Sequence, residues 1–518
     1  MRKTSRLLAC VAAGATAITL ATAPAVLASG PAAPATPGSP TPADCTGPAG
    51  NPAPGTPAWT ERDEINQFCA TQRQADELDN PSFAAIFDEE TPTLYADQNI
   101  AMFEEPGHPH VTLAQVIPGG STADPFRTIS RWTAAGRGVV TPISFAASDG
   151  AQLNGYVFSP PKSVPKPASG YPGIVITTGS IQGYQQLYFW AAEGLAEAGY
   201  MVMTYDVQGQ GSSDTLPSSC QPSQAQLAQQ SVCPGVPFQQ SYNFFQGTED
   251  ALNFFFSTPS HPYPGPAPSP AATLTTVGQT LNAYNPEYAD LDTTRVGIAG
   301  HSLGASAVSQ VGQCDARVKA IVAWDNLAPA TACVANQPLT LRTPALGINS
   351  EYFFNPEPMT SVPDAHAKDQ AFKQLATAGV DTMQVALRSS MHLEYSYVPY
   401  ILPASSLGER VAFYYTLAWF DHYLRGDPTG LTRLTATTFD GSSDAHSIGA
   451  GDYSPQAALA DPTDPAAGNV PYKIAGLAVA DRLSFYYESE YALTSPTGEK
   501  TTCSDMRAGC PASPPATP

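Results

Sequence analysis

Residues 296–304 read Val-Gly-Ile-Ala-Gly-His-Ser-Leu-Gly, an apolar run that leads directly into the pattern Gly-x-Ser-x-Gly. Small residues follow at 305–308, as in a closely packed helix. A strand, a sharp turn and a helix in this order hold a serine at the tip of the turn, with its hydroxyl exposed. Gly300 and Gly304 leave room for the turn, because a side chain at either position would collide with a neighbouring strand or helix. The stretch therefore predicts Ser302 as a candidate nucleophile.

Short apolar runs alternate with helical patterns on both sides of this stretch. Asp149-Gly150 predicts a hairpin turn between strands near 142–145 and 153–158. Strands alternating with helices predict an α/β fold, in which a mainly parallel sheet is covered by helices on both faces. The expected strands are 173–178, 201–206, 295–300, 318–324, 345–349 and 383–387, and the expected helices include 186–198, 248–257 and 408–424.

The composition divides the chain into segments. A basic start, an apolar stretch and small residues before Ala28 predict a secretory signal peptide over 1–28. Interpretation as a membrane anchor is disfavoured, because Gly, Thr and Pro interrupt the apolar run. The Pro- and Ala-rich residues 29–58 predict a flexible linker. The remaining expected segments are an N-terminal extension over 59–140, the α/β domain over 141–430, and a β-rich C-terminal appendage over 431–518 that packs on that domain.

Two insertions, 215–241 and 258–290, interrupt the alternating pattern. Both follow the carboxyl ends of expected strands, where sites in α/β proteins lie. They are interpreted either as the rim of a substrate cleft or as surface decoration, and the sequence leaves both open.

Charge and cysteine content limit the partners and the compartment. The chain of 518 residues carries a net charge of −21, which becomes −24 when the signal's Arg2, Lys3 and Arg6 are removed. Such a chain is repelled by nucleic acid and anionic lipid, so we expect neither a nucleic-acid partner nor a stable membrane anchor. Eight of the nine cysteines follow the signal, which predicts four disulfides in an exported protein. Pairing of sequence neighbours, one of many arrangements, gives Cys45–Cys69, Cys220–Cys233, Cys314–Cys333 and Cys503–Cys510.

A serine hydroxyl needs a base to remove its proton, and the base needs an acid to orient it. His392 directly follows a late expected strand and precedes the helix at 408–424, so it is the candidate base. Two carboxylates are candidate acids. Asp325 ends the strand after the serine turn, and Glu351 follows the next strand. The residues alone leave both open.

A negative charge on the attacked carbonyl oxygen requires two fixed N–H donors. Leu303, directly after the nucleophile, is one candidate. The loop after Thr177-Thr178-Gly179 supplies the other, with Ser180 preferred and Ile181 next. Asp206, before the Gly209-Gln210-Gly211 turn, is expected to hold that turn rather than to bind a dinucleotide, because the third glycine and the following helix are missing.

Several of these segments together resemble the α/β-hydrolase superfamily over about residues 140–425. Gly300-His301-Ser302-Leu303-Gly304, Ala323-Trp324-Asp325, Ile348–Phe353 and Arg388–His392 are similar to the platelet-activating-factor acetylhydrolase-like lipases and esterases. The Pro-rich exported character resembles actinobacterial dienelactone-hydrolase-like and cutinase-like esterases. The resemblance implies an α/β-hydrolase fold and favours Asp325 as the acid, with Glu351 beside the site. Ala305 departs from the pattern, since such enzymes often have a second glycine there.

The leading hypothesis is therefore a secreted serine esterase or lipase acting on a small-molecule or lipid ester, with no metal or organic cofactor. Aromatic residues near the expected cleft would suit an acyl chain or an aromatic ester, although such residues more often pack a core: Tyr184, Tyr188, Phe189, Trp190, Tyr352 and Phe353. One alternative is a serine peptidase or amidase similar to prolyl oligopeptidase. Another is an extracellular binding protein without catalytic activity. The oligomeric state is left open.

Overall fold

The computed structural model describes residues 40–82, 127–180, 185–213, 241–266, 280–333, 338–396, 406–446 and 452–510, apart from 46, 47, 49, 51, 79, 354, 359, 464–466, 471 and 496. The predicted signal peptide and most of the insertion at 215–241 lie outside these residues. So do Cys220 and Cys233, whereas the other three predicted disulfides are present and confirmed. None of the helices within the described ranges is long and apolar enough to cross a membrane.

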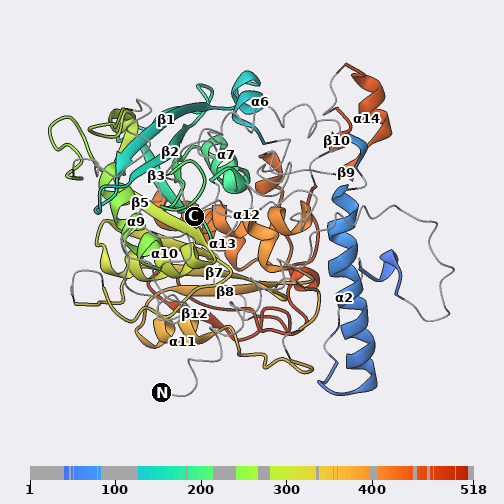
Figure 1. The fold of residues 1–518 in the computed structure, drawn as a ribbon. Coiled ribbons are helices and arrows are strands. Elements are labelled where there is room, and N and C mark those ends of the chain that lie inside the picture. Colours follow the sequence, from blue (N-terminus) through green and yellow to red (C-terminus); the bar gives the residue numbers. More distant parts are fainter. Residues whose placement is uncertain are drawn as a thin grey trace.

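A ten-stranded mixed sheet with the strand order β1-β2-β4-β3-β5-β6-β7-β8-β11-β12 forms the centre of the molecule (Figure 1). The six strands from β4 to β8 in this order pair in parallel. On one side β2 pairs antiparallel with β4 and with β1, and on the other side β11 pairs antiparallel with β8 and with β12. The predicted α/β class with a mainly parallel sheet is therefore confirmed. The strands are β1 (Val139–Ala146), β2 (Gln152–Ser159), β3 (Tyr171–Thr177), β4 (Met201–Tyr205), β5 (Leu291–His301), β6 (Val318–Trp324), β7 (Ala345–Ser350), β8 (Thr382–Leu387), β11 (Glu490–Thr494) and β12 (Lys500–Cys503).

Helices cover both faces of this sheet because successive residues of each strand point to opposite sides. On β3, Ile174 and Ile176 join one apolar core and Val175 joins the other. One core contains residues of α7 (Phe189–Glu197) and α12 (Ser406–Phe420), and the other contains residues of α9 (Ser241–Phe255), α10 (Leu303–Cys314) and α11 (Gln370–Thr377). Within the described residues, the other α-helices are α2 (Pro57–Leu78), α6 (Ile129–Ala134), α13 (Pro428–Leu434) and α14 (Pro455–Ala460).

Local sequence signals account for several boundaries. The hairpin predicted at Asp149-Gly150 joins β1 to β2, and Gly150 has a φ of 86°. Gly199, with a φ of 94°, follows the end of α7, where only glycine enters the left-handed region at little cost. The helix predicted at 408–424 runs as α12 and continues in a π-helical turn (Asp421–Arg425) up to Gly426.

Residues 431–518, expected to be β-rich, contain the aromatic run Leu483–Tyr487. This run is irregular apart from one isolated bridge between Leu483 and Leu387. Its aromatic side chains instead pack in a small core with Trp59 of α2. The strands of this region are β11 and β12, and β11 pairs with β8, so the central sheet continues past residue 430. A two-stranded sheet of β9 (Asp452–Tyr453) and β10 (Asn469–Val470) lies apart from it.

Glu490 of β11 makes the stability of the central sheet sensitive to pH. The residue is buried on β11 opposite Gln384, and its Oε1 has no hydrogen-bond partner among the described residues. Burial, together with nearby Asp369 and Glu488, raises the pKa of Glu490 to about 8. A carboxyl whose pKa is raised on folding contributes stability below its unfolded pKa, and this contribution is lost as the pH rises through the folded value.

Glu490→Gln, which mimics the protonated carboxyl, should therefore leave the melting temperature unchanged at pH 5 and raise it by roughly 2–4 °C at pH 9. Thermal unfolding of both proteins at the two pH values measures this. Exposed Glu499, on the turn between β11 and β12, provides the control as Glu499→Gln. Equal melting temperatures of wild type and Glu490→Gln at pH 9 would contradict the assignment.

Candidate active site

Ser302 lies between the last residue of β5 and the first residue of α10, with φ 57° and ψ −119°. The turn is closed by glycines at both ends. A Cβ on Gly300 would lie 2.5 Å from the carbonyl oxygen of Gly304, and one on Gly304 would lie 2.4 Å from the carbonyl oxygens of Thr177 and Thr178. Real Cβ atoms do not approach backbone atoms this closely, so the turn requires glycine at both positions.

The structure brings the predicted nucleophile, base and acid together in one chain of hydrogen bonds. The Oγ of Ser302 lies 3.0 Å from Nε2 of His392, and Nδ1 of His392 lies 2.7 Å from Oδ2 of Asp325. A carboxylate can only accept, so Nδ1–H donates to Asp325 and Nε2 is left to accept from the serine hydroxyl. The three residues follow β5, β6 and β8, at the carboxyl ends of parallel strands.

Three residues at this site have left-handed backbone conformations. Ser302, Asp325 and Ser389 have φ values of 57°, 38° and 56°, and they are the non-glycine residues with positive φ within the described ranges. Such a conformation costs about 1–3 kcal/mol at each residue and persists only where the surrounding structure enforces it. The concentration of strained backbone at one place is typical of a functional site.

Asp325 is held as a carboxylate. Its oxygens accept from the backbone N–H of Ser350 at 3.1 Å and from the Ser350 hydroxyl at 2.5 Å, and the ammonium of Lys368 lies 3.7 Å away. Burial alone would raise the pKa of Asp325, but the Lys368 charge and the hydrogen bond from His392 hold it well below its usual value. Asp325 therefore stays ionised at neutral pH.

Glu351, the other candidate acid, lies elsewhere in the site. Its carboxylate is buried and accepts from the backbone N–H groups of Ser389 and Phe485, both at 2.6 Å, and from the side-chain amide of Asn66 at 2.5 Å. Asp325, and not Glu351, accepts from the imidazole of His392. Glu351 instead connects three separate segments beside the site.

The loop expected to supply the second N–H donor lies against Ser302, the candidate nucleophile. A Cβ on Gly179 would lie 3.1 Å from the Cβ of Ser302, so the backbone of Gly179 and its neighbour Ser180 passes directly beside the serine. Gln210 donates to the Gly179 carbonyl at 2.9 Å. Leu303 opens α10, where the first N–H groups have no acceptor within the helix. Ile181, the other candidate donor, lies outside the described residues.

Asp206 holds the turn that carries Gln210. Its carboxylate accepts from the backbone N–H groups of Gln185 at 2.8 Å and Ser212 at 2.9 Å. Burial raises the pKa of Asp206 to about 6, against the lowering effect of these hydrogen bonds. A Cβ on Gly211 would lie 2.3 Å from the Asp206 Cγ, which explains the glycine there. Asp206 thus fastens this turn to the 3-10 helix η2 (Gln185–Tyr188).

His301 has a role that sequence reasoning missed. Its Nε2 lies 2.9 Å from the backbone carbonyl oxygen of His392, and its Nδ1 lies 2.9 Å from the Tyr188 hydroxyl, which accepts from the Gly179 N–H at 2.9 Å. Because a carbonyl can only accept, Nε2 carries the proton and Nδ1 accepts from Tyr188. Burial, with the nearby His392, lowers the pKa of His301 to about 3, so it stays neutral. Its position inside the Gly-x-Ser-x-Gly pattern was the available signal.

The aromatic residues named as candidates divide into two groups. Tyr188, Phe189, Trp190 and Tyr352 are buried in the cores, whereas Tyr184 lies outside the described residues. Phe353 is 38% exposed, and its ring centroid lies 4.8 Å from that of His392. Among the described members of this set, Phe353 is therefore the one placed to meet a bound molecule beside His392.

No protein-family model matches this chain, and no curated protein does.

Tyr188→Phe should be destabilising, because it leaves Nδ1 of His301 and the N–H of Gly179 without their partner in a buried place. The expected loss is about 1–3 kcal/mol in the free energy of unfolding, measured by chemical denaturation. Tyr415→Phe is the matched control, since the buried Tyr415 hydroxyl has no hydrogen-bond partner in the part of the chain described here. Equal stability of the two variants would show that the Tyr188 hydroxyl contributes no more than the unpartnered one.

Proposed function

We propose that this protein is a secreted serine hydrolase of the α/β-hydrolase fold that cleaves carboxylic esters, with Ser302, His392 and Asp325 as its catalytic triad. The observation that carries the proposal is the hydrogen-bonded chain from the Ser302 hydroxyl through His392 to Asp325. The serine on a strand-to-helix turn and the chain order Ser, Asp, His support it, because both are features of α/β-hydrolases.

In the first half of the reaction, His392 Nε2 takes the proton from the Ser302 hydroxyl as Oγ attacks the ester carbonyl carbon. The carbonyl electron pair moves onto the oxygen, where the N–H groups of Leu303 and Ser180 would stabilise the charge. The pair then returns, the bond to the alcohol oxygen breaks, and His392 gives its proton to the departing alcohol. An acyl-enzyme on Ser302 remains.

In the second half, His392 takes a proton from water as the water oxygen attacks the acyl carbon. The bond to Ser302 Oγ then breaks, His392 returns the proton to the serine, and the carboxylic acid leaves. Throughout, Asp325 keeps the His392 ring in its orientation and stabilises its protonated form. These steps need only an ester and water, and the protein's groups return to their starting protonation states.

Export is the second part of the proposal. The three disulfides at Cys45–Cys69, Cys314–Cys333 and Cys503–Cys510 support it, because disulfides persist in oxidising compartments. The predicted signal peptide over 1–28 is the sequence feature that would direct the chain there.

Hydrolysis of p-nitrophenyl acetate, butyrate and a long-chain ester should be detectable with the wild type. The turnover number should fall about 10⁶-fold in Ser302→Ala and about 10⁴-fold in Asp325→Asn. Both variants should keep the wild-type melting temperature within a few degrees. A fluorophosphonate probe should label the wild type and not Ser302→Ala. A probe-reactive wild type that turns over no ester would overturn the ester assignment and direct the search to peptides. Absence of labelling would overturn the serine-hydrolase assignment.

Glu351→Gln requires a stability measurement beside the activity measurement. Both oxygens of the Glu351 carboxylate accept from backbone N–H groups. The NH₂ group of a glutamine would therefore face one of these donors without an acceptor. A lowered turnover number with a lowered melting temperature is the expected result, and it distinguishes a structural carboxylate from the triad acid.

A further inference from the structure

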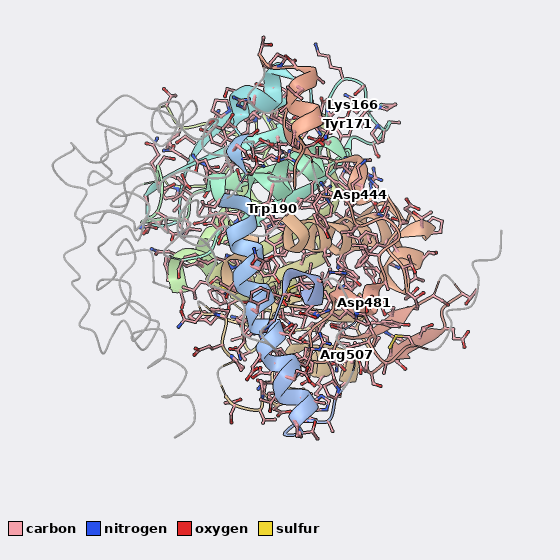
Figure 2. All side chains as sticks on the ribbon, turned by 90° about the vertical axis from the view of Figure 1, so that its right-hand side faces the viewer. Lys166, Tyr171, Trp190, Asp444, Asp481 and Arg507 are labelled. Atoms are coloured by element: carbon pink, nitrogen blue, oxygen red, sulfur yellow. A yellow bond between two sulfur atoms is a disulfide. The ribbon has the colours of Figure 1, made fainter. Side chains whose placement is uncertain are left out.

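Helix α2, from the N-terminal extension, packs beside the candidate active site. Figure 1 shows it along one side of the molecule, and Figure 2 looks onto that side. Trp59 of α2 lies 5.5 Å from the ring of Phe485 and 6.1 Å from that of Tyr486. The same small core contains Tyr352 and Met391, which adjoin Glu351 and His392 in sequence. The helix is therefore integrated with the segments that carry the base.

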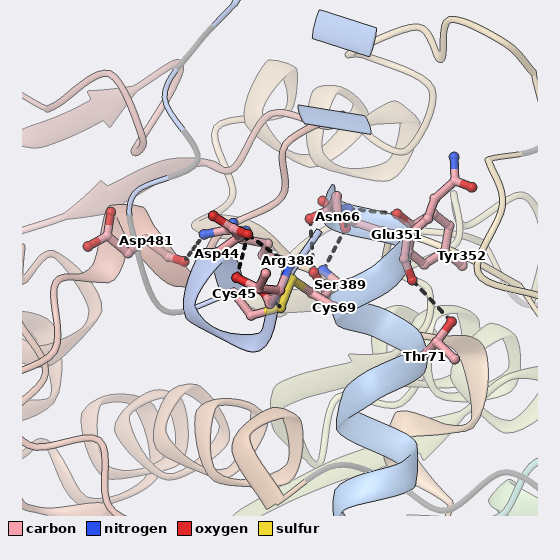
Figure 3. The surroundings of a disulfide bond; sticks show 12 residues. Asp44, Cys45, Asn66, Cys69, Thr71, Glu351, Tyr352, Arg388, Ser389 and Asp481 are labelled. Atoms are coloured by element: carbon pink, nitrogen blue, oxygen red, sulfur yellow. Dashed lines mark hydrogen bonds between the residues drawn. A yellow bond between two sulfur atoms is a disulfide. The ribbon is translucent and has the colours of Figure 1, made fainter. Parts of the chain in front are cut away.

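Asn66 is the polar centre of this contact. It is fully buried, and its amide nitrogen donates to Glu351 at 2.5 Å and to the Tyr352 hydroxyl at 2.7 Å. Its carbonyl oxygen accepts from the Ser389 hydroxyl at 2.9 Å. Figure 3 shows the residue on α2 one turn from the Cys45–Cys69 disulfide, with Glu351 and Ser389 facing it. The nitrogen and the oxygen of the Asn66 amide are thus both hydrogen-bonded to loops at the site.

From Asn66 the connection to the base is short. Ser389, three residues before His392, also donates its backbone N–H to Glu351 at 2.6 Å, which keeps it in the left-handed conformation. The next carbonyl, of Ser390, accepts from the N–H groups of Glu351 and Tyr352. The N–H of His392 then donates to the Phe353 carbonyl at 2.9 Å. The turn that carries the imidazole is therefore fixed to the segment that Asn66 holds.

We propose that Asn66 is a positioning residue of the hydrolytic reaction: through Glu351 and Ser389 it holds the turn that directs His392 toward Ser302. The inference rests on the proposed function for its kinetic part. Helix α2 would then contribute to catalysis, although this helix lies far from Ser302 in the sequence and outside the residues that resemble α/β-hydrolases. The buried amide acts through geometry, since it does not touch the reacting atoms.

Asn66→Ala should lower the turnover number about 10–100-fold and leave KM nearly unchanged, because a misdirected base slows proton transfer without altering ester binding. Hydrogen exchange at the amides of 387–396 should speed up in the same variant. Exposed Glu64 on the same helix supplies the control, and Glu64→Ala should change neither quantity. Wild-type turnover and exchange in Asn66→Ala would overturn the proposal.

Coupling distinguishes positioning from a general loss of stability. Ser389→Ala removes the hydroxyl that Asn66 holds, so the double variant Asn66→Ala/Ser389→Ala should be little slower than Asn66→Ala alone. If the two substitutions instead lowered the turnover number by the product of their separate effects, Asn66 and Ser389 would act independently, and the proposed link would be contradicted.

A second pair of variants loosens α2 without altering the network. Cys45→Ser/Cys69→Ser removes the disulfide that joins α2 to the preceding 3-10 helix η1 (Pro42–Cys45), and Cys314→Ser/Cys333→Ser removes one at the far end of α10. Only the first should speed exchange at 387–396 and lower the turnover number at an unchanged KM. Equal effects of the two would contradict the inference. A wild type without esterase activity would refute the proposed function, and hydrogen exchange would still decide whether Asn66 holds the turn.

Discussion

The close approach of the Ser302 turn to the end of β3 is the constraint on which the rest of the site depends. Gly304 lies so near the carbonyls of Thr177 and Thr178 that no side chain fits between them. This contact places the loop at Gly179 and Ser180 beside the serine. The candidate nucleophile and the expected oxyanion donors therefore lie together because the first turn of α10 packs against the end of β3, the strand that pairs with β5.

A second layer of buried hydrogen bonds links the parts that this contact brings together. His301, Tyr188 and Gly179 connect the Ser302 turn, the loop at Gly179 and the His392 carbonyl in one line of hydrogen bonds. Glu351 and Asn66 connect the other side of the histidine turn to α2 and to Phe485. Such groups are costly to bury unpaired, so each network tolerates few alternative arrangements. Ser389, one of the three residues with positive φ, belongs to the second network through its backbone N–H and its hydroxyl.

Local patterns predicted the parallel part of the sheet well. The expected strand at 318–324 coincides with β6, and those at 345–349 and 383–387 differ from β7 and β8 by one residue. Buried parallel strands are continuous apolar runs bounded by polar residues, a signal contained in the run itself. Helix α2 lacked such a signal, because its sequence is mostly polar and its buried side contacts residues hundreds of positions away. Leu483–Tyr487, in the segment expected to be β-rich, forms no strand, since its aromatic residues pack against Trp59 of α2.

The sequence by itself determined the α/β class, the turn at Ser302, and the candidates His392, Asp325 and Glu351. Strand periodicity, glycine spacing and residue chemistry are local properties, so they can be recognised without coordinates. Only the tertiary structure decided which carboxylate meets the imidazole, and it gave Glu351, His301 and Asn66 their partners. Those contacts join segments separated by as many as 323 residues. A hydrogen bond over that separation depends on how the sheet and its loops pack, and no local pattern encodes it.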